Sequence, residues 1–328
     1  MTECGVPAPG AAGPVLEGRS PGRRFSEQAW AALFAAPALL LVGAFALVPI
    51  LAAVGLSLQR RMPIFGIQEF VGLRNYALLW EDDRFWAATW TTLYFAVASV
   101  GAELLLGLGI ALLLNCTWGE PTRAGDLAAT GGRQAWVRVL ILIPWAIPTV
   151  VSARMWGWLY QPETGLIGYI LAATGLLREP INWLGDPWWG LHAAILMDVW
   201  KTTPFAVLLL LAGLKAIPEE LYLAARVDGA GAWAQFWHVT FPLLVPVLVI
   251  VLIFRTMDAF RVFDAVYVLT GGGPGNSTET LSIFAYKVLF QRLEFGYGSA
   301  VASVTFLVIL SITLGYLVLL RRQLRATA

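Results

Sequence analysis

Six long apolar stretches constrain what this chain can fold into. They lie at about residues 28–56, 88–115, 138–160, 189–214, 243–267 and 297–320. A helix needs about 20 mostly apolar residues to cross a hydrocarbon core of about 30 Å. Only 13% of the residues are charged, whereas about a quarter are charged in typical soluble domains, so most soluble classes are excluded. We therefore predict an all-α membrane protein with six transmembrane helices.

The two ends of the chain are polar tails that flank one membrane domain. We predict a disordered N-terminal tail at residues 1–27, a six-span domain at 28–320 and a C-terminal tail at 321–328. A cleavable signal peptide is the alternative for the N-terminal region. Its apolar part should have about 7 to 15 residues, and the run from Ala29 to Leu58 is about twice that length. We interpret this run as a retained first span.

The distribution of basic residues predicts that both termini lie inside the cell. With this orientation the inner segments hold eleven basic residues and the outer segments hold seven. The inner set is Arg19, Arg23, Arg24, Arg123, Arg133, Arg138, Lys215, Arg226, Arg321, Arg322 and Arg325. The outer set is Arg60, Arg61, Arg74, Arg84, Arg178, Lys287 and Arg292. Four of the outer arginines lie in the segment between the first two spans, against the general rule.

Several functional classes find no support in the sequence. The formal net charge is +1 and the basic residues are scattered, so we expect no nucleic-acid partner. Cys4 and Cys116 both fall in segments expected inside the cell, and His192 and His238 lie on opposite sides, so we expect no disulfide framework and no metal site. The run GGGPGNST at 271–278 lacks the G-x-x-x-x-G-K-[ST] spacing of a phosphate loop. We predict a turn there.

A polar segment at residues 215–242 interrupts the apolar chain between the fourth and fifth spans. Pro218 suits the first turn of a helix, and Glu219 and Glu220 favour the positive end of its dipole. We predict a short helix that ends at Gly229, with Asp228 capping a second helix. The second helix would place Trp233, Phe236 and Trp237 on one face. An interfacial helix lying on lipid explains these aromatics, but the small, polar stretch at 224–232 better fits insertion into a protein groove.

Ionisable residues also occur within the predicted spans, where they cost several kcal/mol and usually face the protein interior. They are Glu103, Asp198, Lys201, Arg255, Asp258 and Arg261. Asp198 and Lys201 are three residues apart, and the same spacing continues from Arg255 through Asp258 and Arg261 to Asp264. This spacing predicts pairing of opposite charges along each helix. Two interpretations remain open: the pairs hold the helices together, or the fourth and fifth spans line a path for a polyhydroxylated substrate.

The polar segment resembles the cytoplasmic EAA loop of permease subunits in bacterial ATP-binding-cassette importers. The loop pattern is Glu-Ala-Ala, three residues, Gly, nine residues, then Ile-x-Leu-Pro. Ala224, Ala225, Gly229 and Pro242 match at the same spacing, while Leu223 occupies the glutamate position. Three other stretches are similar to carbohydrate-importer permeases of the maltose, glycerol-3-phosphate and trehalose type. They are FVGLRNY (70–76), DVWKTTPF (198–205) and RTMDAFRVFDAVYVLTGGGPGNST (255–278).

The resemblance implies a type I importer permease fold with a cytoplasmic coupling helix, in the bacterial inner membrane. It implies a non-catalytic subunit that imports a sugar, such as the disaccharides trehalose or maltose. The implied partners are a second permease subunit, an ATPase homodimer and an extracytoplasmic sugar-binding protein. The ATPase would carry ATP and Mg²⁺, with no cofactor on this chain, which lacks a phosphate-loop sequence. Membrane lipid would surround the spans.

The resemblance also implies two sets of site residues. Residues expected to contact the ATPase are Glu219, Glu220, Leu223, Ala224, Ala225, Arg226, Asp228, Gly229, Ala230 and Trp233. Residues expected along the substrate path are Asp198, Trp200, Lys201, Thr202, Arg255, Asp258, Ala259, Arg261, Val262 and Phe263. In related permeases the positions of Asp258, Ala259 and Val262 contact sugar, and the last two are apolar here. An ion-coupled secondary transporter or channel and a membrane-embedded enzyme are the alternative classes.

Overall fold

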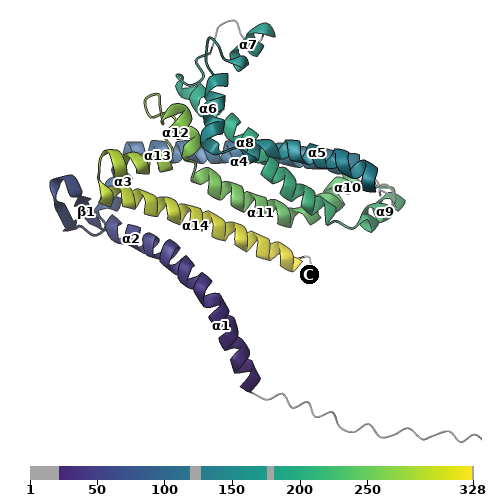
Figure 1. The fold of residues 1–328 in the computed structure, drawn as a ribbon, viewed down its shortest axis with the longest axis horizontal. Helices are drawn as coiled ribbons and strands as arrows, with labels where there is room; N and C mark the ends of the chain where they lie inside the picture. The colour runs from purple at the N-terminus through teal and green to yellow at the C-terminus, as the bar shows by residue number, and fades with distance from the viewer. Residues whose placement is uncertain (1–21, 119–126, 176–180, 327–328) are drawn as a thin grey trace, which may run out of the picture. The chain divides into compact units, whose positions relative to one another are not determined.

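The computed structural model describes residues 22–118, 127–175 and 181–326, and most of them are helical (Figure 1). The chain divides into two compact units, residues 1–52 and 53–328. The first unit holds α1 (Gly22–Val42), the π-helix η1 (Gly43–Leu47) and the start of α2 (Val48–Ser57). Most of the predicted N-terminal tail lies outside the described residues, and α1 begins at Gly22.

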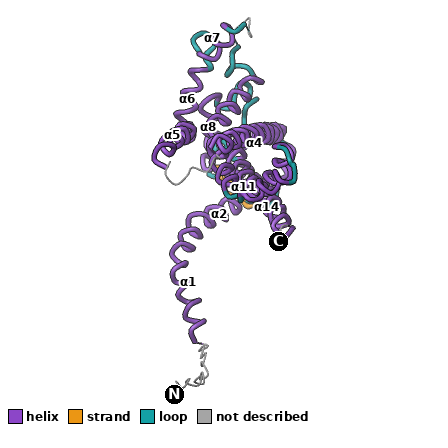
Figure 2. Tube along the Cα trace, turned by 90° about the vertical axis from the view of Figure 1, so that its right-hand side faces the viewer, coloured by secondary structure: helices purple, strands orange, loops and turns teal. Residues whose placement is uncertain are grey.

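Within the described residues, five helices are long and apolar enough to cross a membrane. A bent pair of helices can serve as a sixth span, in agreement with the predicted number. In the second unit, α4 (Asp83–Trp118), α8 (Pro187–Lys215), α11 (Phe241–Phe260) and α14 (Phe295–Ala326) form a packed group. Figure 2 shows α6 (Thr149–Leu159) and α7 (Leu166–Ala173) projecting from one side of this group.

Close packing of α4, α8 and α11 forms the core of the second unit. Phe95, Met197 and Val266 are buried in one apolar cluster, and Leu210 and Leu244 are buried in another. Glycine permits the closest approach between α8 and α11. A Cβ atom at Gly213 would lie 2.9 Å from side-chain carbons of both Leu244 and Val247. Small residues at helix contacts are what close packing in a membrane requires.

The third span is not the single helix predicted at 138–160. Helix α5 (Leu127–Ala146) ends before Pro148, and α6 (Thr149–Leu159) leaves at 96° to its direction (Figure 1). Pro148 has no N–H to donate and lies at φ −55° and ψ 139°, outside the helical region. The helical hydrogen-bond ladder therefore stops here, and the carbonyl groups that end α5 need other donors.

The predicted bounds of the fifth span, 243–267, are wrong at both ends. The helix runs without interruption from Ala232 to Phe260 through α10 (Ala232–Gln235), the π-helix η3 (Phe236–Thr240) and α11. It includes Pro242 and Pro246, which both lie within α11. A break at 261–263 separates it from α12 (Asp264–Thr270). The last part of the polar segment, from Ala232, and the fifth span therefore form one continuous helix.

A small hairpin and two short helices cover one end of the helix group. Strand β1 (Gln59–Met62) pairs antiparallel with β2 (Ile67–Phe70) around η2 (Pro63–Phe65), and α3 (Arg74–Glu81) follows. The amide of Asn75 donates to the carbonyl oxygens of Ser57 at 2.7 Å and Gln59 at 2.9 Å. A Cβ atom at Gly296 would lie 1.9 Å from the Gln59 carbonyl oxygen, so α14 begins directly against β1.

The glycine-rich run at 271–278 forms turns, as predicted, ahead of α13 (Leu281–Tyr286) and the π-helix η4 (Lys287–Gln291). Glu279 anchors these turns through salt bridges of 2.7 Å to Arg84 and 2.9 Å to Lys287. Burial alone would raise the pKa of Glu279, but the hydrogen bonds from Arg84 and Lys287 outweigh it and hold the pKa below its ordinary value. The carboxylate therefore stays charged and keeps the loop attached to α4.

We predict that Gly213→Ala destabilises the protein by about 1–3 kcal/mol, because the new methyl group overlaps Leu244 and Val247 in a packed core. Thermal unfolding of the purified protein measures the change. Gly109→Ala in α4 is the matched control, since nothing lies within 4 Å of a Cβ atom there. Equal melting temperatures for Gly213→Ala and the control would show that α8 and α11 are not in close contact.

Candidate functional site

A cavity of about 460 Å³ lies where α8, α11 and the break after α11 meet. Eight of the ten residues predicted along the substrate path line it: Asp198, Lys201, Thr202, Arg255, Asp258, Arg261, Val262 and Phe263. Trp145, Thr149, Asp264 and Ala265 complete the lining and were not predicted. The other two predicted residues do not line it. Trp200 packs edge-on against Trp156, and Ala259 is buried in the apolar core.

Arg255 is the centre of the charged residues behind this cavity. Its guanidinium forms two hydrogen bonds with Glu103 of α4, one through Nε to Oε2 and one of 2.9 Å through Nη2 to Oε1. It also lies 3.4 Å from Asp198 of α8 and 3.3 Å from Asp258 of α11. Arg255 is only 4% exposed, and Glu103 is fully buried. One side chain therefore joins three helices.

Glu103 was recognised in the sequence as an ionisable residue within a span, but its partner was not. It lies 152 positions from Arg255 in the chain, so helical spacing gives no signal for the pair. The hydroxyl of Thr202 lies 2.6 Å from Glu103 Oε1 and 2.6 Å from the carbonyl oxygen of Asp198, and it can donate its single hydrogen to either of them. The pairing explains how a buried carboxylate is tolerated inside the membrane.

Two of the predicted pairs along single helices are wrong. Among the described residues, no ion pair joins Asp198 to Lys201 or Arg261 to Asp264. Instead, the ammonium group of Lys201 donates to the carbonyl oxygens of Trp145 at 3.3 Å and Ile147 at 2.9 Å, where α5 ends. Asp264 lies beyond the helix break and begins α12. The Arg255–Asp258 and Asp258–Arg261 pairs are confirmed, the latter at 3.0 Å.

Lys201 therefore satisfies the carbonyl groups that the bend after α5 leaves without a helical donor. A cation near a helix C-terminus also interacts favourably with the helix dipole. Lys201 also lines the cavity, together with Trp145 and Thr149 on the two sides of the bend. A ligand in the cavity would therefore contact α8, α11 and the break between α5 and α6.

The lining suits an uncharged ligand with many hydroxyl groups. Its formal charges balance, with Lys201, Arg255 and Arg261 against Asp198, Asp258 and Asp264. Carboxylates accept hydrogen bonds from hydroxyls, and guanidinium and ammonium groups donate to them. Trp145 and Phe263 add flat apolar surfaces to the lining. Trp145 stacks on Phe205 at 6.0 Å, and Phe263 stacks on Tyr267 at 5.0 Å.

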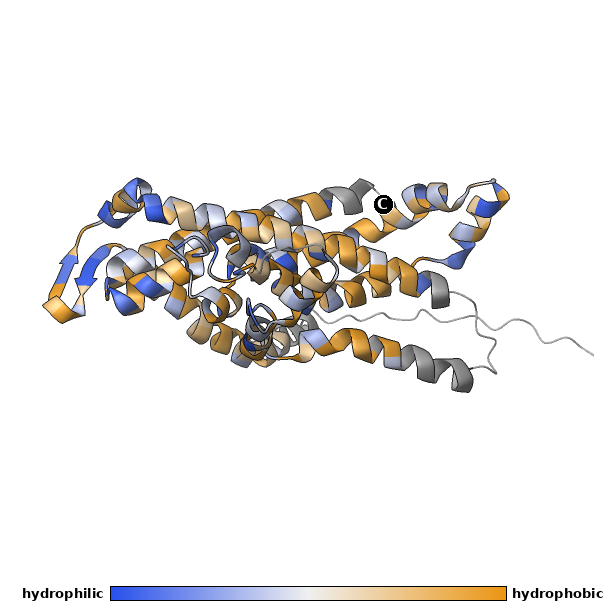
Figure 3. Cartoon of the chain, turned by 90° about the horizontal axis from the view of Figure 1, so that it is seen from above, coloured by the Kyte–Doolittle hydropathy of each residue, from blue (hydrophilic) through white to orange (hydrophobic). Residues whose placement is uncertain are grey.

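The residues expected to contact the ATPase lie between positions 219 and 233, near the start of the continuous helix from Ala232 to Phe260. Figure 3 shows hydrophilic residues concentrated at the two ends of the second unit, around the hairpin and around α9 (Glu219–Val227). Helix α9 begins after Pro218 and ends before Gly229, which has φ +79°, so the predicted start and end of this helix are confirmed. Eight of the ten predicted contact residues are exposed, and Ala225 and Ala230 are half-buried.

Asp228 does not cap the following helix, contrary to expectation. It is the last residue of the α9 turn, and α10 begins after Gly231 without a side-chain cap. The second helix is also not a separate amphipathic segment, because it continues into the fifth span. Its aromatic residues form a cluster, with ring centroids 5.7 Å apart for Trp233 and Trp237 and 5.3 Å apart for Phe236 and Trp237.

Two contacts fix α9 to the helix that follows it. The hydroxyl of Tyr222 lies 2.9 Å from that of Thr240, and the side-chain amide of Gln235 donates to the Ala230 carbonyl oxygen at 2.8 Å. The exposed face of α9 carries apolar side chains, of which Val227 is 88% exposed and Leu223 is 49% exposed. The result is a projection attached to a continuous helix that carries Arg255 and Asp258 near its far end at Phe260.

Comparison with known proteins decides the family. Residues 127–325 match the model of the binding-protein-dependent transport system inner membrane component. This chain belongs to that family. The match confirms the resemblance seen in the sequence and makes the chain a multi-pass inner-membrane permease subunit of an ATP-binding-cassette transporter.

Several curated relatives extend over nearly the whole chain. The trehalose/maltose transport system permease protein MalF of Thermococcus litoralis is 44% identical over 281 residues, 86% of this chain and 90% of its own length. The sulfoquinovosyl glycerol transport system permease protein SmoG of Agrobacterium fabrum is 37% identical, over 89% and 91%. The trehalose transport system permease protein SugA of Mycobacterium tuberculosis is 39% identical, over 87% and 86%.

A solved structure supports the fold. The permease fold matches a chain of a bacterial ABC transporter involved in the import of the acidic polysaccharide alginate, with a TM-score of 0.74 over 92% of this chain and 98% of that chain. The sequence identity is 23%, so this likeness concerns the arrangement of the helices. The predicted type I importer permease architecture is confirmed.

We predict that Arg255→Met destabilises the permease by about 3–5 kcal/mol, because Glu103 and Asp198 lose a buried counter-ion. Arg261→Met is the matched control. It removes an exposed ion pair with Asp258 and should cost less than about 1 kcal/mol. Thermal unfolding in detergent compares the two. If both variants melt at the same temperature, Arg255 does not hold the three helices together.

Proposed function

We propose that this chain forms half of the translocation pathway of an ATP-driven importer for a neutral disaccharide such as trehalose or maltose. The other half would come from a second permease subunit. An ATPase homodimer would bind ATP and Mg²⁺ on the cytoplasmic side, and an extracytoplasmic sugar-binding protein would deliver the substrate. The observation that carries the proposal is the continuous helix from Ala232 to Phe260, with an exposed projection at one end and a charge-balanced cavity at the other.

The ATPase would dock on α9 and the turn after it. Leu223, Val227 and Trp233 offer exposed apolar area there, and Glu219, Glu220 and Arg226 offer charged groups at its edge. Arg226 or the glutamates would supply the polar contacts that the family makes through a glutamate at the position of Leu223. Because Tyr222 and Gln235 tie α9 to the following helix, a displacement of α9 would move that helix as a body.

The orientation that fits this function has both termini in the cytoplasm. It puts α9 on the side where ATP is available. The excess of basic residues in the inner segments, eleven against seven, supports the same orientation.

The substrate would bind in the cavity lined by Asp198, Lys201, Asp258 and Phe263. Two of the curated relatives are named for trehalose or for trehalose and maltose. A balanced set of charges favours a neutral sugar over an acidic one, since an acidic sugar would add an unpaired negative charge inside the membrane. Trp145 and Phe263 would pack against the apolar faces of the sugar rings.

Uptake of labelled trehalose into vesicles tests the proposal. We expect vesicles that contain the complete complex to accumulate the sugar only with ATP and binding protein. Trp145→Leu should lower the uptake rate about threefold to tenfold, as expected for the loss of an aromatic contact of about 0.5–1.5 kcal/mol. Trp158→Leu is the control, because Trp158 is exposed on α6 and does not line the cavity.

Uptake driven by this chain alone, without ATP, would instead assign it to the ion-coupled transporters or channels. Equal uptake by the two tryptophan variants would overturn the placement of the sugar in this cavity. Competition by maltose and by an acidic disaccharide distinguishes the substrate classes, and only the neutral sugar should compete.

A further inference from the structure

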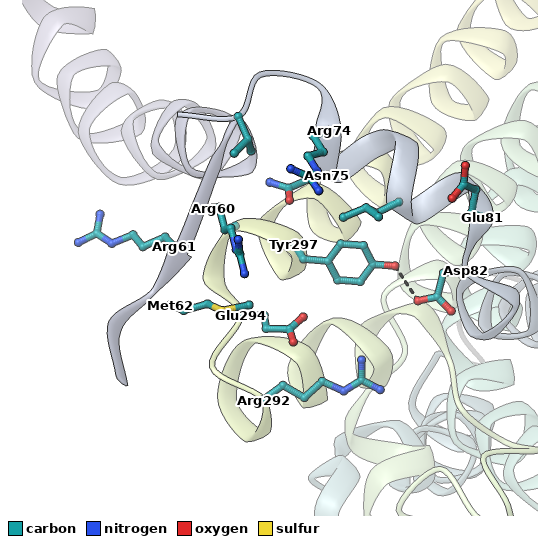
Figure 4. Close-up of a pocket in the computed structure, with 13 residues that line it drawn as sticks. Arg60, Arg61, Met62, Arg74, Asn75, Glu81, Asp82, Arg292, Glu294 and Tyr297 are labelled. Carbon is teal, nitrogen blue, oxygen red and sulfur yellow. Dashed lines mark hydrogen bonds between the residues drawn. The ribbon is translucent and has the colours of Figure 1, made fainter. Parts of the chain in front are cut away.

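A second cavity, of about 560 Å³, lies between β1, α3 and the first turn of α14. It is formed by residues that follow the first span and residues that precede the sixth. Figure 4 shows Arg60, Met62, Glu294 and Tyr297 grouped around it, with Arg292 and Asp82 beside them. This cavity is lined by none of the residues expected to contact the ATPase or to lie along the substrate path.

The cavity wall carries charged groups that lack partners. Four arginines line it: Arg60, Arg61, Arg74 and Arg292. Within residues 22–118, 127–175 and 181–326, none of these guanidinium groups forms an ion pair or a side-chain hydrogen bond. Of the three lining carboxylates, Asp82 is engaged, since it accepts from the Tyr297 hydroxyl at 2.6 Å and the Arg84 amide at 2.9 Å. The side chains of Glu81 and Glu294 have no hydrogen bond or salt bridge within the part of the chain that the structure describes.

The position of these arginines is unusual for a membrane protein. Three of them belong to the outer segment between the first two spans, where basic residues are normally depleted. Arginine donors in a fork geometry bind phosphate groups bidentately. A phosphate ligand would explain why four arginines converge on a wall whose carboxylates form no ion pair with them among the described residues.

The cavity lies at the level where lipid head groups begin. Strand β1 starts two residues after α2 ends at Ser57, and α14 starts at the residue after Glu294. Both helices are apolar spans. Apolar side chains surround the charged wall: Leu78 lines it, and Leu73 and Trp80 of the same segment are exposed. Tryptophan is typical of this interfacial layer. A water-soluble anion would not need these apolar neighbours, whereas the acyl chains of a lipid would contact them.

The framework around the cavity is rigid. Asn75 holds the start of β1 through two carbonyl oxygens, and Gly296 lets α14 approach the same strand. A volume of about 560 Å³ falls in the range of small-molecule sites, about 300–1,000 Å³. A concave, preformed site fits a head group better than it fits the flat surface of a folded protein.

We propose that this cavity binds the head group of a membrane phospholipid. The phosphodiester would lie on the guanidinium groups of Arg60, Arg74 and Arg292. Hydrogen-bond donors of the head group, such as the hydroxyls of phosphatidylglycerol or the ammonium of phosphatidylethanolamine, would be accepted by Glu81 and Glu294. The bound lipid would link the hairpin to the start of α14. This inference depends on the spans alone, and not on the direction of transport.

Native mass spectrometry of the purified full-length chain, titrated with dioctanoyl phosphatidylglycerol, tests the proposal. We expect a saturable lipid adduct. The double variant Arg60→Gln, Arg292→Gln should weaken it about 25-fold, about fivefold for each arginine at about 1 kcal/mol. Arg154→Gln is the control for the loss of a positive charge elsewhere, because Arg154 is exposed on α6 outside the cavity and its change should leave the affinity unchanged.

Two comparisons on the unmodified chain keep the test independent of how well the variants fold. Dioctanoylglycerol, which lacks the phosphate, should not form the adduct. Dioctanoyl phosphatidylethanolamine should form it, and dioctanoyl phosphatidic acid, which lacks the donors for Glu81 and Glu294, should bind more weakly. Equal affinity of the double variant and the Arg154→Gln control would overturn the proposal. So would loss of binding-protein docking in the double variant with unchanged lipid affinity, since the cavity would then serve an acidic protein partner.

Discussion

One buried guanidinium, that of Arg255, determines how the membrane core of this protein is assembled. A charge within a span costs several kcal/mol unless it is paired, and Arg255 pairs with carboxylates on α4, α8 and α11. Removing α11 from this arrangement would leave Glu103 and Asp198 without their counter-ion. Apolar burial is non-directional, whereas these ion pairs specify which positions on the three helices face one another. Arg255, Asp198 and Asp258 also line the cavity between these helices.

The continuous helix of the fifth span connects the charged residues around Arg255 to the α9 projection. The helix that carries Arg255 and Asp258 begins at Ala232, next to the α9 projection. Tyr222 and Gln235 connect α9 to that helix, and Lys201 connects α8 to the end of α5 at the bend. We infer that a force applied at α9 would reach the cavity through helices and hydrogen bonds, without a flexible joint between them. The break after Phe260 then lies where the helix would have to change direction relative to α12.

Much of this architecture follows from residue types alone. The number of spans, the α9 start at Glu219 and its end at Gly229 came from apolar length, a proline and a glycine with positive φ. Of the eight predicted residues that line the cavity, five are ionisable side chains inside spans, which usually face inward, and the other three came from the family resemblance. The pairing was harder, since spacing along one helix detects only neighbours within it. Glu103 is distant in sequence from Arg255. Lys201 donates to the Ile147 carbonyl oxygen at the bend after α5, and the prolines in the sequence do not predict the 96° angle of that bend.

The most direct test of the account is to change the turn after α9 and to measure both ATP hydrolysis and sugar uptake. Gly229→Trp changes an exposed glycine at φ +79°, and Gly175→Trp changes an exposed glycine at φ +72° after α7, with open space around both. In vesicles that contain the complete transporter, the account predicts that Gly229→Trp lowers sugar uptake at least about tenfold, a loss of about 1.4 kcal/mol in coupling, while ATP hydrolysis continues and Gly175→Trp transports normally. Uptake by Gly229→Trp at the rate of the unmodified chain would contradict it.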